Sequence, residues 1–92
     1  MSNERKQVLL DHLAKLKSEV TKLAVTHGEQ ADSIAGFAQV STHEATRKNQ
    51  NPDALEHSVA GLRSSVEGFE QSHPHLVQVV NNISNTLANL GI

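Results

Sequence analysis

The segment from Phe69 to Ile92 constrains the fold most strongly, because it contains a helix start, an apolar stripe and a helix stop. Its large apolar residues recur at alternating spacings of four and three, which places them on one face of an α-helix. This stripe consists of Leu76, Val80, Ile83, Leu87 and Leu90. A stripe of this kind becomes buried only against another helix, so the segment predicts a helical bundle.

Both ends of this helix carry signals in the sequence. The ring of Pro74 disfavours a helical conformation for the preceding residue, so we expect Pro74 in the first turn and Ser72 or His73 as the cap. At the other end, Leu90 to Ile92 fits a Schellman motif, in which glycine takes the left-handed conformation. The segment therefore predicts a helix with a defined start and a defined stop.

The polar face of this helix carries no charge, since no Asp, Glu, Lys or Arg occurs from Gln71 to Ile92. Helices that face water normally carry charged side chains. Asn and Gln, by contrast, can be buried in an interface when they pair by hydrogen bonds. Two hypotheses stay open: this face binds a subunit or partner, or it is an uncharged surface in water. Its residues, called the asparagine face below, are Gln78, Asn81, Asn82, Asn85 and Asn89.

The stretch from Ser2 to about Thr26 repeats the four-three rhythm and predicts an amphipathic helix. Its stripe consists of Leu9, Leu13, Leu16, Val20 and Leu23. Gly28 can end this helix, and the phase then continues through Ile34 and Phe37 in a helix of about residues 29–48. The other stripe positions of that helix are polar. We expect the weakest packing there, because the core face is otherwise completed only by the small residues Ala31, Ala38 and Ala45.

A clear break between helices lies just before Pro52. Asn51 fits an N-cap and Pro52 a first helical residue. The stripe of the helix that follows consists of Leu55, Val59, Leu62, Val66 and Phe69. Its phase continues across the break near Pro74 into the last helix.

We expect one all-α domain spanning residues 1–92. Two arms, about residues 4–49 and 52–90, form an antiparallel helical hairpin with mid-arm breaks near Gly28 and Pro74. Two arrangements stay open. In the preferred one, two long kinked arms pair with those of a second copy in a coiled-coil-like homodimer. In the other, the arms fold at both breaks into a compact four-helix bundle of one chain.

Composition argues against several classes of function. A net charge of -2 gives no basic excess to neutralise a phosphate backbone, and two Phe without Trp or Tyr offer few stacking platforms for bases. Nucleic-acid binding is therefore not expected. The absence of cysteine excludes disulfides and thiolate metal sites. No apolar run approaches the roughly 18 residues of a membrane span, so we expect a soluble cytoplasmic protein without membrane contact.

The C-terminal region resembles a known family. The sequences FEQSHPHL at residues 69–76 and LANLGI at residues 87–92, with Ile83 between them, resemble the bacterial family named domain of unknown function 4404. The resemblance is loosest over residues 28–51. It implies a small helical protein from a bacterium, and it implies no catalytic residues.

Six histidines raise the question of a metal site or a pH response. His27, His73 and His75 lie at the level of the two breaks, but the spacing of His73 and His75 does not suit two metal ligands on one helix. We therefore predict no metal ion and no cofactor. A pH-responsive core is a separate hypothesis, because protonation of His27 or His73 would place charge on the stripe. A melting temperature that does not change with pH would argue against it.

No arrangement of residues predicts catalysis. Ser and Thr lie along helices, outside the strand–turn context typical of a nucleophile, and Asp and Glu lie mainly on polar faces. We therefore expect a non-enzymatic interaction or scaffold protein that acts through homo-oligomerisation, as a dimer, or through binding of a partner helix. The alternative is a small nucleic-acid- or ribosome-associated factor. It would use the basic residues of the first helix, Lys15, Lys17 and Lys22.

Overall fold

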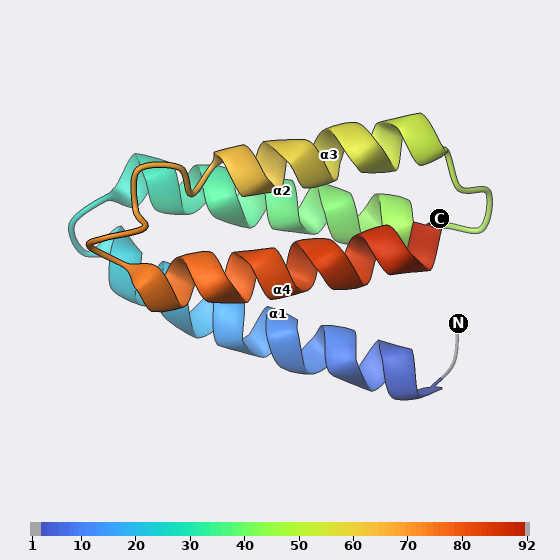
Figure 1. The fold of residues 1–92 in the computed structure, drawn as a ribbon, viewed down its shortest axis with the longest axis horizontal. Coiled ribbons are helices and arrows are strands. Elements are labelled where there is room, and N and C mark those ends of the chain that lie inside the picture. Colours follow the sequence, from blue (N-terminus) through green and yellow to red (C-terminus); the bar gives the residue numbers. More distant parts are fainter. Residues whose placement is uncertain (1–2, 92) are drawn as a thin grey trace.

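A computed structural model describes residues 3–91, apart from the side chains of residues 3, 5 and 91. Within this range the chain forms four α-helices, and each runs antiparallel to the next along the chain (Figure 1). Their bounds are α1 (Asn3–Ala24), α2 (Gly28–Thr46), α3 (Pro52–Ser64) and α4 (Pro74–Gly91). The prediction of an all-α fold with breaks near Gly28 and Pro74 is confirmed.

Helices α2 and α4 form the centre of the bundle. Each contacts the other three helices, whereas α1 and α3 make no contact with each other within the described residues. The cross-section is therefore a rhombus, with α2 and α4 across its short diagonal. In Figure 1, α1 and α3 accordingly lie along the lower and upper edges of the molecule.

Both mid-arm breaks are complete chain reversals. The described chain measures 37 × 25 × 18 Å, whereas one continuous helix of about 46 residues would be about 69 Å long. Of the two arrangements, the chain thus adopts the four-helix bundle in place of two long kinked arms. The predicted neighbours are still paired, α1 with α4 and α2 with α3, because both arms fold at the same level.

The second reversal uses a longer connection than the continuous apolar phase indicated. Helix α3 ends at Ser64, and residues 65–73 form the connection to α4. Gly68 in this connection has φ of 95°, a left-handed conformation that favours glycine. Val66 and Phe69 reach the core from this connection, so their place in the stripe does not depend on a continuous helix.

The turn between α2 and α3 has the predicted cap. The Asn51 side chain accepts hydrogen bonds from the backbone N–H groups of Asp53 at 3.0 Å and Ala54 at 3.1 Å. Two of the first N–H groups of α3, which have no partner within the helix, are thereby satisfied. Pro52 occupies the first helical turn, as its fixed φ allows.

The start of α4 agrees with the prediction from sequence, whereas its end lies one residue later than predicted. The helix begins at Pro74, and the His73 carbonyl accepts its first hydrogen bond at 3.2 Å. At the other end the helix includes Gly91, one residue beyond the predicted stop at Leu90. Ile92, which the predicted Schellman motif requires, lies outside the described residues.

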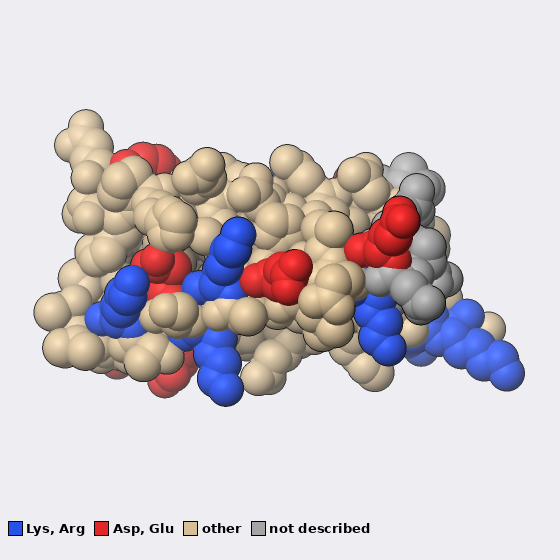
Figure 2. Space-filling model, turned by 90° about the horizontal axis from the view of Figure 1, so that it is seen from below, with Lys and Arg blue, Asp and Glu red and all other residues tan. Residues whose placement is uncertain are grey.

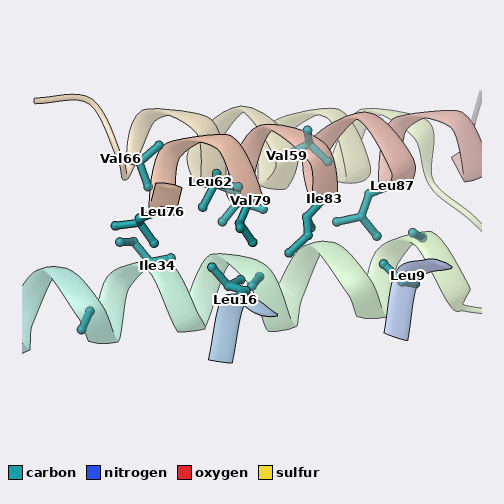
Figure 3. Close-up of a cluster of buried hydrophobic side chains, with 14 of the residues drawn as sticks. Leu9, Leu16, Ile34, Val59, Leu62, Val66, Leu76, Val79, Ile83 and Leu87 are labelled. Carbon is teal, nitrogen blue, oxygen red and sulfur yellow. The ribbon is translucent and has the colours of Figure 1, made fainter. Parts of the chain in front are cut away.

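The core is built from the apolar stripes of all four helices. Its buried stripe members are Leu9, Leu16, Leu23, Leu55, Val59, Leu62, Val66, Leu76, Val80, Ile83 and Leu87. The partly buried members packed against them are Leu13, Val20, Phe69 and Leu90. Figure 3 shows side chains from α3 and α4 pointing toward Leu16 of α1 and Ile34 of α2.

Helix α2 contributes mostly small side chains to this core. Its buried residues are Ala31, Ile34, Ala38, Ser41 and Ala45. Phe37, which continued the predicted apolar phase, is instead 40% exposed. Its ring lies over Gly61 of α3, where a Cβ atom would collide with it. The missing side chain at Gly61 thus gives Phe37 a place outside the core.

Candidate functional site

The candidate site is the surface of α2, because this central helix leaves apolar area uncovered on both flanks. On the α3 flank, Phe37 is 40% and Val40 is 52% exposed. They border a groove of about 570 Å³, called the Phe37 face below. It is lined by Ser33, Gly36, Phe37, Val40, Ala54, His57 and Ser58. None of these residues is Asp, Glu, Lys or Arg, and His57 is the one titratable residue among them, so the exposed surface of this groove is mostly apolar.

On its other flank, α2 borders a groove against α1 of about 610 Å³. The floor of this α1–α2 groove forms because Ala35 and Ala38 of α2 face Leu13 and Val20 of α1, and two alanines do not fill the space that larger residues would. The rim is polar and includes Lys17. The sequence predicted its weakest packing in this helix, and the α1–α2 groove lies there.

The asparagine face lies on the outer side of α4. Gln78, Asn81, Asn82, Asn85 and Asn89 are all exposed in the described chain. Arg63 of α3 reaches across and donates a hydrogen bond from Nη2 to the Asn85 Oδ1 at 2.9 Å. The five side chains thus share the exposed side of α4. That face nevertheless borders one arginine, which the sequence of α4 alone does not reveal.

Two of the predicted histidines meet at the reversal end of the bundle. The ring centroids of His27 and His73 are 5.9 Å apart, and the Phe69 ring lies 5.5 Å from His27 and 5.4 Å from His73. All three pairs are edge to face, the arrangement that aromatic quadrupoles favour. Each histidine shares a hydrogen bond through Nδ1 with the preceding hydroxyl, Thr26 at 2.7 Å and Ser72 at 2.9 Å.

The third predicted histidine lies elsewhere. His75 Nε2 lies 3.4 Å from a carboxylate oxygen of Glu19 on α1. His27 and His73 precede the first residues of α2 and α4, so their positions follow from two similar helix starts. Within residues 3–91, no group of three or more His, Asp or Glu side chains is placed to hold a metal ion. Through their edge-to-face contacts, His27, Phe69 and His73 pack the two helix starts against each other.

The basic residues of α1 do not form a patch of one sign. Lys15, Lys17 and Lys22 are exposed, but Lys22 Nζ lies 3.8 Å from a carboxylate oxygen of Glu19. Figure 2 views the molecule from the α1 side and shows basic and acidic side chains interleaved along this surface. Alternating charge attracts a phosphate backbone less strongly than a uniformly basic surface.

The Phe37 face was missed by reasoning from sequence. A signal was present in the adjacent residues Gly36 and Phe37 and in Val40, which share no stripe with the small buried residues of α2. Treating α2 as a separate helix, with a core face of its own, would have left these residues outside the core.

A family model described as a domain of unknown function matches residues 9–92, which include nearly all of the four helices. The chain belongs to this family, DUF4404. No curated protein matches the chain, and no solved structure does. The described part of this DUF4404 chain has no helix both long and apolar enough to cross a membrane.

Proposed function

We propose that the protein is a non-enzymatic interaction or scaffold module that works by docking a further helix against α2. One observation carries the proposal. Helix α2 is central to the bundle, yet apolar area remains open on both its flanks, at the Phe37 face and in the α1–α2 groove. Exposed apolar patches are a common feature of interaction sites, and the proposal places the partner on these two open areas.

A helix is the occupant that these two surfaces suit. Each lies between two antiparallel helices and follows α2, over residues 33–40 on one flank and 35–46 on the other. Amphipathic helices bind in grooves of this kind through residues spaced three and four apart. A docked helix would pack on α2 in the same way that α1 and α3 do. The docked helix comes from a second copy or from another protein.

Apart from Thr26 and Ser72, which hydrogen-bond to the neighbouring His27 and His73, several hydroxyl groups are engaged with their own helices, and this supports a non-enzymatic role. Thr21, Thr42 and Thr86 each donate to the backbone carbonyl four residues earlier, at 2.8, 2.8 and 2.9 Å. Buried Ser84 does the same to Val80 at 2.8 Å. A hydroxyl engaged with its own helix is not placed beside a base, as a nucleophile requires.

Affinity enrichment from the source cell with four tagged forms tests the proposal. Val40→Glu places a charge on the Phe37 face, Gln39→Glu places one in the α1–α2 groove, and Leu10→Glu places one on an exposed apolar position of α1. Both an untagged copy of the chain and other proteins are quantified. We expect the wild type and Leu10→Glu to recover the same binder, and at least one of the two α2 variants to lose it. Equal recovery by all four forms would contradict the proposal.

A further inference from the structure

We infer that the Phe37 face binds a second copy of this chain, so that two α2 helices cross about a twofold axis. This inference deepens the proposed function and rests on it, since it selects the occupant of one of the two grooves beside α2. Three features of the Phe37 face carry it: its lack of charge, the glycine at its centre and its shape.

The lack of charge suits contact between identical surfaces. In a twofold interface each residue near the axis lies close to its own copy, so a charged side chain there meets a like charge. The residues lining the Phe37 face include no Asp, Glu, Lys or Arg. Other grooves of the bundle do contain such residues, with Lys17 between α1 and α2, Glu4 between α1 and α4, and Glu56 and Arg63 between α3 and α4. The Phe37 face is thus better suited to its own copy than these grooves are.

Gly36 at the centre of this face has no use within one chain. Glycine is the least favourable residue in a helix interior except for proline. Gly36 does not have the positive φ that makes Gly68 useful, and a Cβ atom at Gly36 would meet nothing within 4 Å. By contrast, Gly61 is needed, because a Cβ atom there would collide with the Phe37 ring. A second helix crossing α2 at Gly36 would explain the glycine, because two backbones approach closely only where side chains are small.

The shape of the face provides both a projection and a hollow. Phe37, Val40 and His57 are the large side chains, and the small ones beside them are Ser33, Gly36, Ala54 and Ser58. When two such faces meet about a twofold axis, the large residues of each copy enter the hollow of the other. The Phe37 ring already rests on Gly61, so little side-chain freedom is lost when it is covered.

The molar mass of the purified protein, measured by sedimentation equilibrium from low micromolar to millimolar concentration, tests the inference. For the wild type we expect the mass to rise from 10.0 kDa toward twice that value. Val40→Glu should weaken the dimer at least about tenfold, because each copy would bury an unpaired carboxylate. Leu10→Glu is the matched control, since Leu10 is 49% exposed and lies on α1. Circular dichroism shows that each variant keeps its helices.

Gly36→Ala gives the more specific test. Alanine stabilises an isolated helix, so the monomer should melt at a higher temperature, yet the added methyl groups should separate the crossing helices and weaken the dimer. A damaged fold cannot produce these two opposite effects together. A wild type that stays monomeric, or a dimer that neither Val40→Glu nor Gly36→Ala weakens, overturns the inference. The proposed function survives that result if Gln39→Glu still removes another protein in the enrichment experiment.

Discussion

Helices α2 and α4 lie across from each other at the centre of the bundle, yet they use their large residues in opposite ways. Helix α4 places Leu76, Ile83 and Leu87 in the core, with at most 1% of each exposed, and presents an uncharged amide surface to the outside. Helix α2 places Ile34 and otherwise small residues in the core, and it leaves Phe37 and Val40 outside. The large core residues of α4 stabilise the chain, whereas under the proposed function the outer residues of α2 provide the surface for another helix.

Replacing a large core residue of α4 should have the largest effect. Leu87 is fully buried, so Leu87→Ala should lower the free energy of unfolding by about 3 kcal/mol, through lost apolar burial and the cavity left behind. Val40→Ala on α2 should change it by less than about 0.5 kcal/mol, because Val40 is 52% exposed. Urea denaturation at a concentration where the protein is monomeric measures both. Similar losses for the two variants would remove the proposed difference between the helices.

Two buried serines, one on each of these helices, allow a matched comparison of hydrogen bonding in the core. Ser41 of α2 and Ser84 of α4 are both fully buried, but Ser84 donates to the Val80 carbonyl, whereas the Ser41 hydroxyl has no hydrogen-bond partner. A buried unpaired hydroxyl is unfavourable, so Ser41→Ala should raise the free energy of unfolding by about 1 kcal/mol. Ser84→Ala should leave it unchanged or lower it by up to about 1 kcal/mol. The prediction fails if Ser41→Ala destabilises the monomer more than Ser84→Ala does.

Gly36 of α2 and Gly61 of α3 test the packing on the outer surface of α2. Gly36→Ala should stabilise the monomer by about 1 kcal/mol, because a Cβ atom there meets nothing and alanine favours the helix. Gly61→Ala gains the same helix propensity but must displace the Phe37 ring, so it should end at least about 1 kcal/mol below Gly36→Ala. Thermal melts of both variants at low protein concentration give the difference. Equal stability would mean that the Phe37 ring is not held against α3.

The parts of the fold that were predictable from sequence depend on local signals. Asn51 before Pro52 marks a helix start whatever surrounds it, and the α4 stripe needs only a single apolar face. The length of the connection between α3 and α4 was not predictable, because the apolar spacing continues through residues 65–73 although the helix ends at Ser64. Val66 and Phe69 keep their places in the core from a non-helical connection, so periodicity alone could not locate the end of α3.

The core face of α2 shows a second limit of reasoning from periodicity. Carrying the phase of α1 past Gly28 selected Ile34 and Phe37 as the large core residues, with alanines such as Ala38 beside them, whereas the helix buries Ile34 and these alanines and leaves Phe37 outside. Phe37 is three residues after Ile34 and Ala38 is four, so each can share a helical face with Ile34. The chain reversal at Gly28 allows α2 to rotate about its own axis, and contacts with three neighbours then decide its orientation. Carrying the phase across the reversal therefore missed the candidate site, because the site consists of the residues that this orientation of α2 leaves outside.

Substitutions on the asparagine face test whether α4 binds a partner as well as packing the core. Their expected effect on stability is the smallest. In Asn82→Glu combined with Asn85→Glu, both changes are at exposed positions, so the free energy of unfolding should change by less than about 0.5 kcal/mol. If two copies meet at the Phe37 face, the mass of the double variant at high concentration should equal that of the wild type, because no residue of α4 lines that face. If this variant no longer dimerises while Val40→Glu still does, the dimer interface lies on α4 and not on α2. Recovery of another protein by the wild type but not by the double variant would show that α4 has a binding role besides its place in the core.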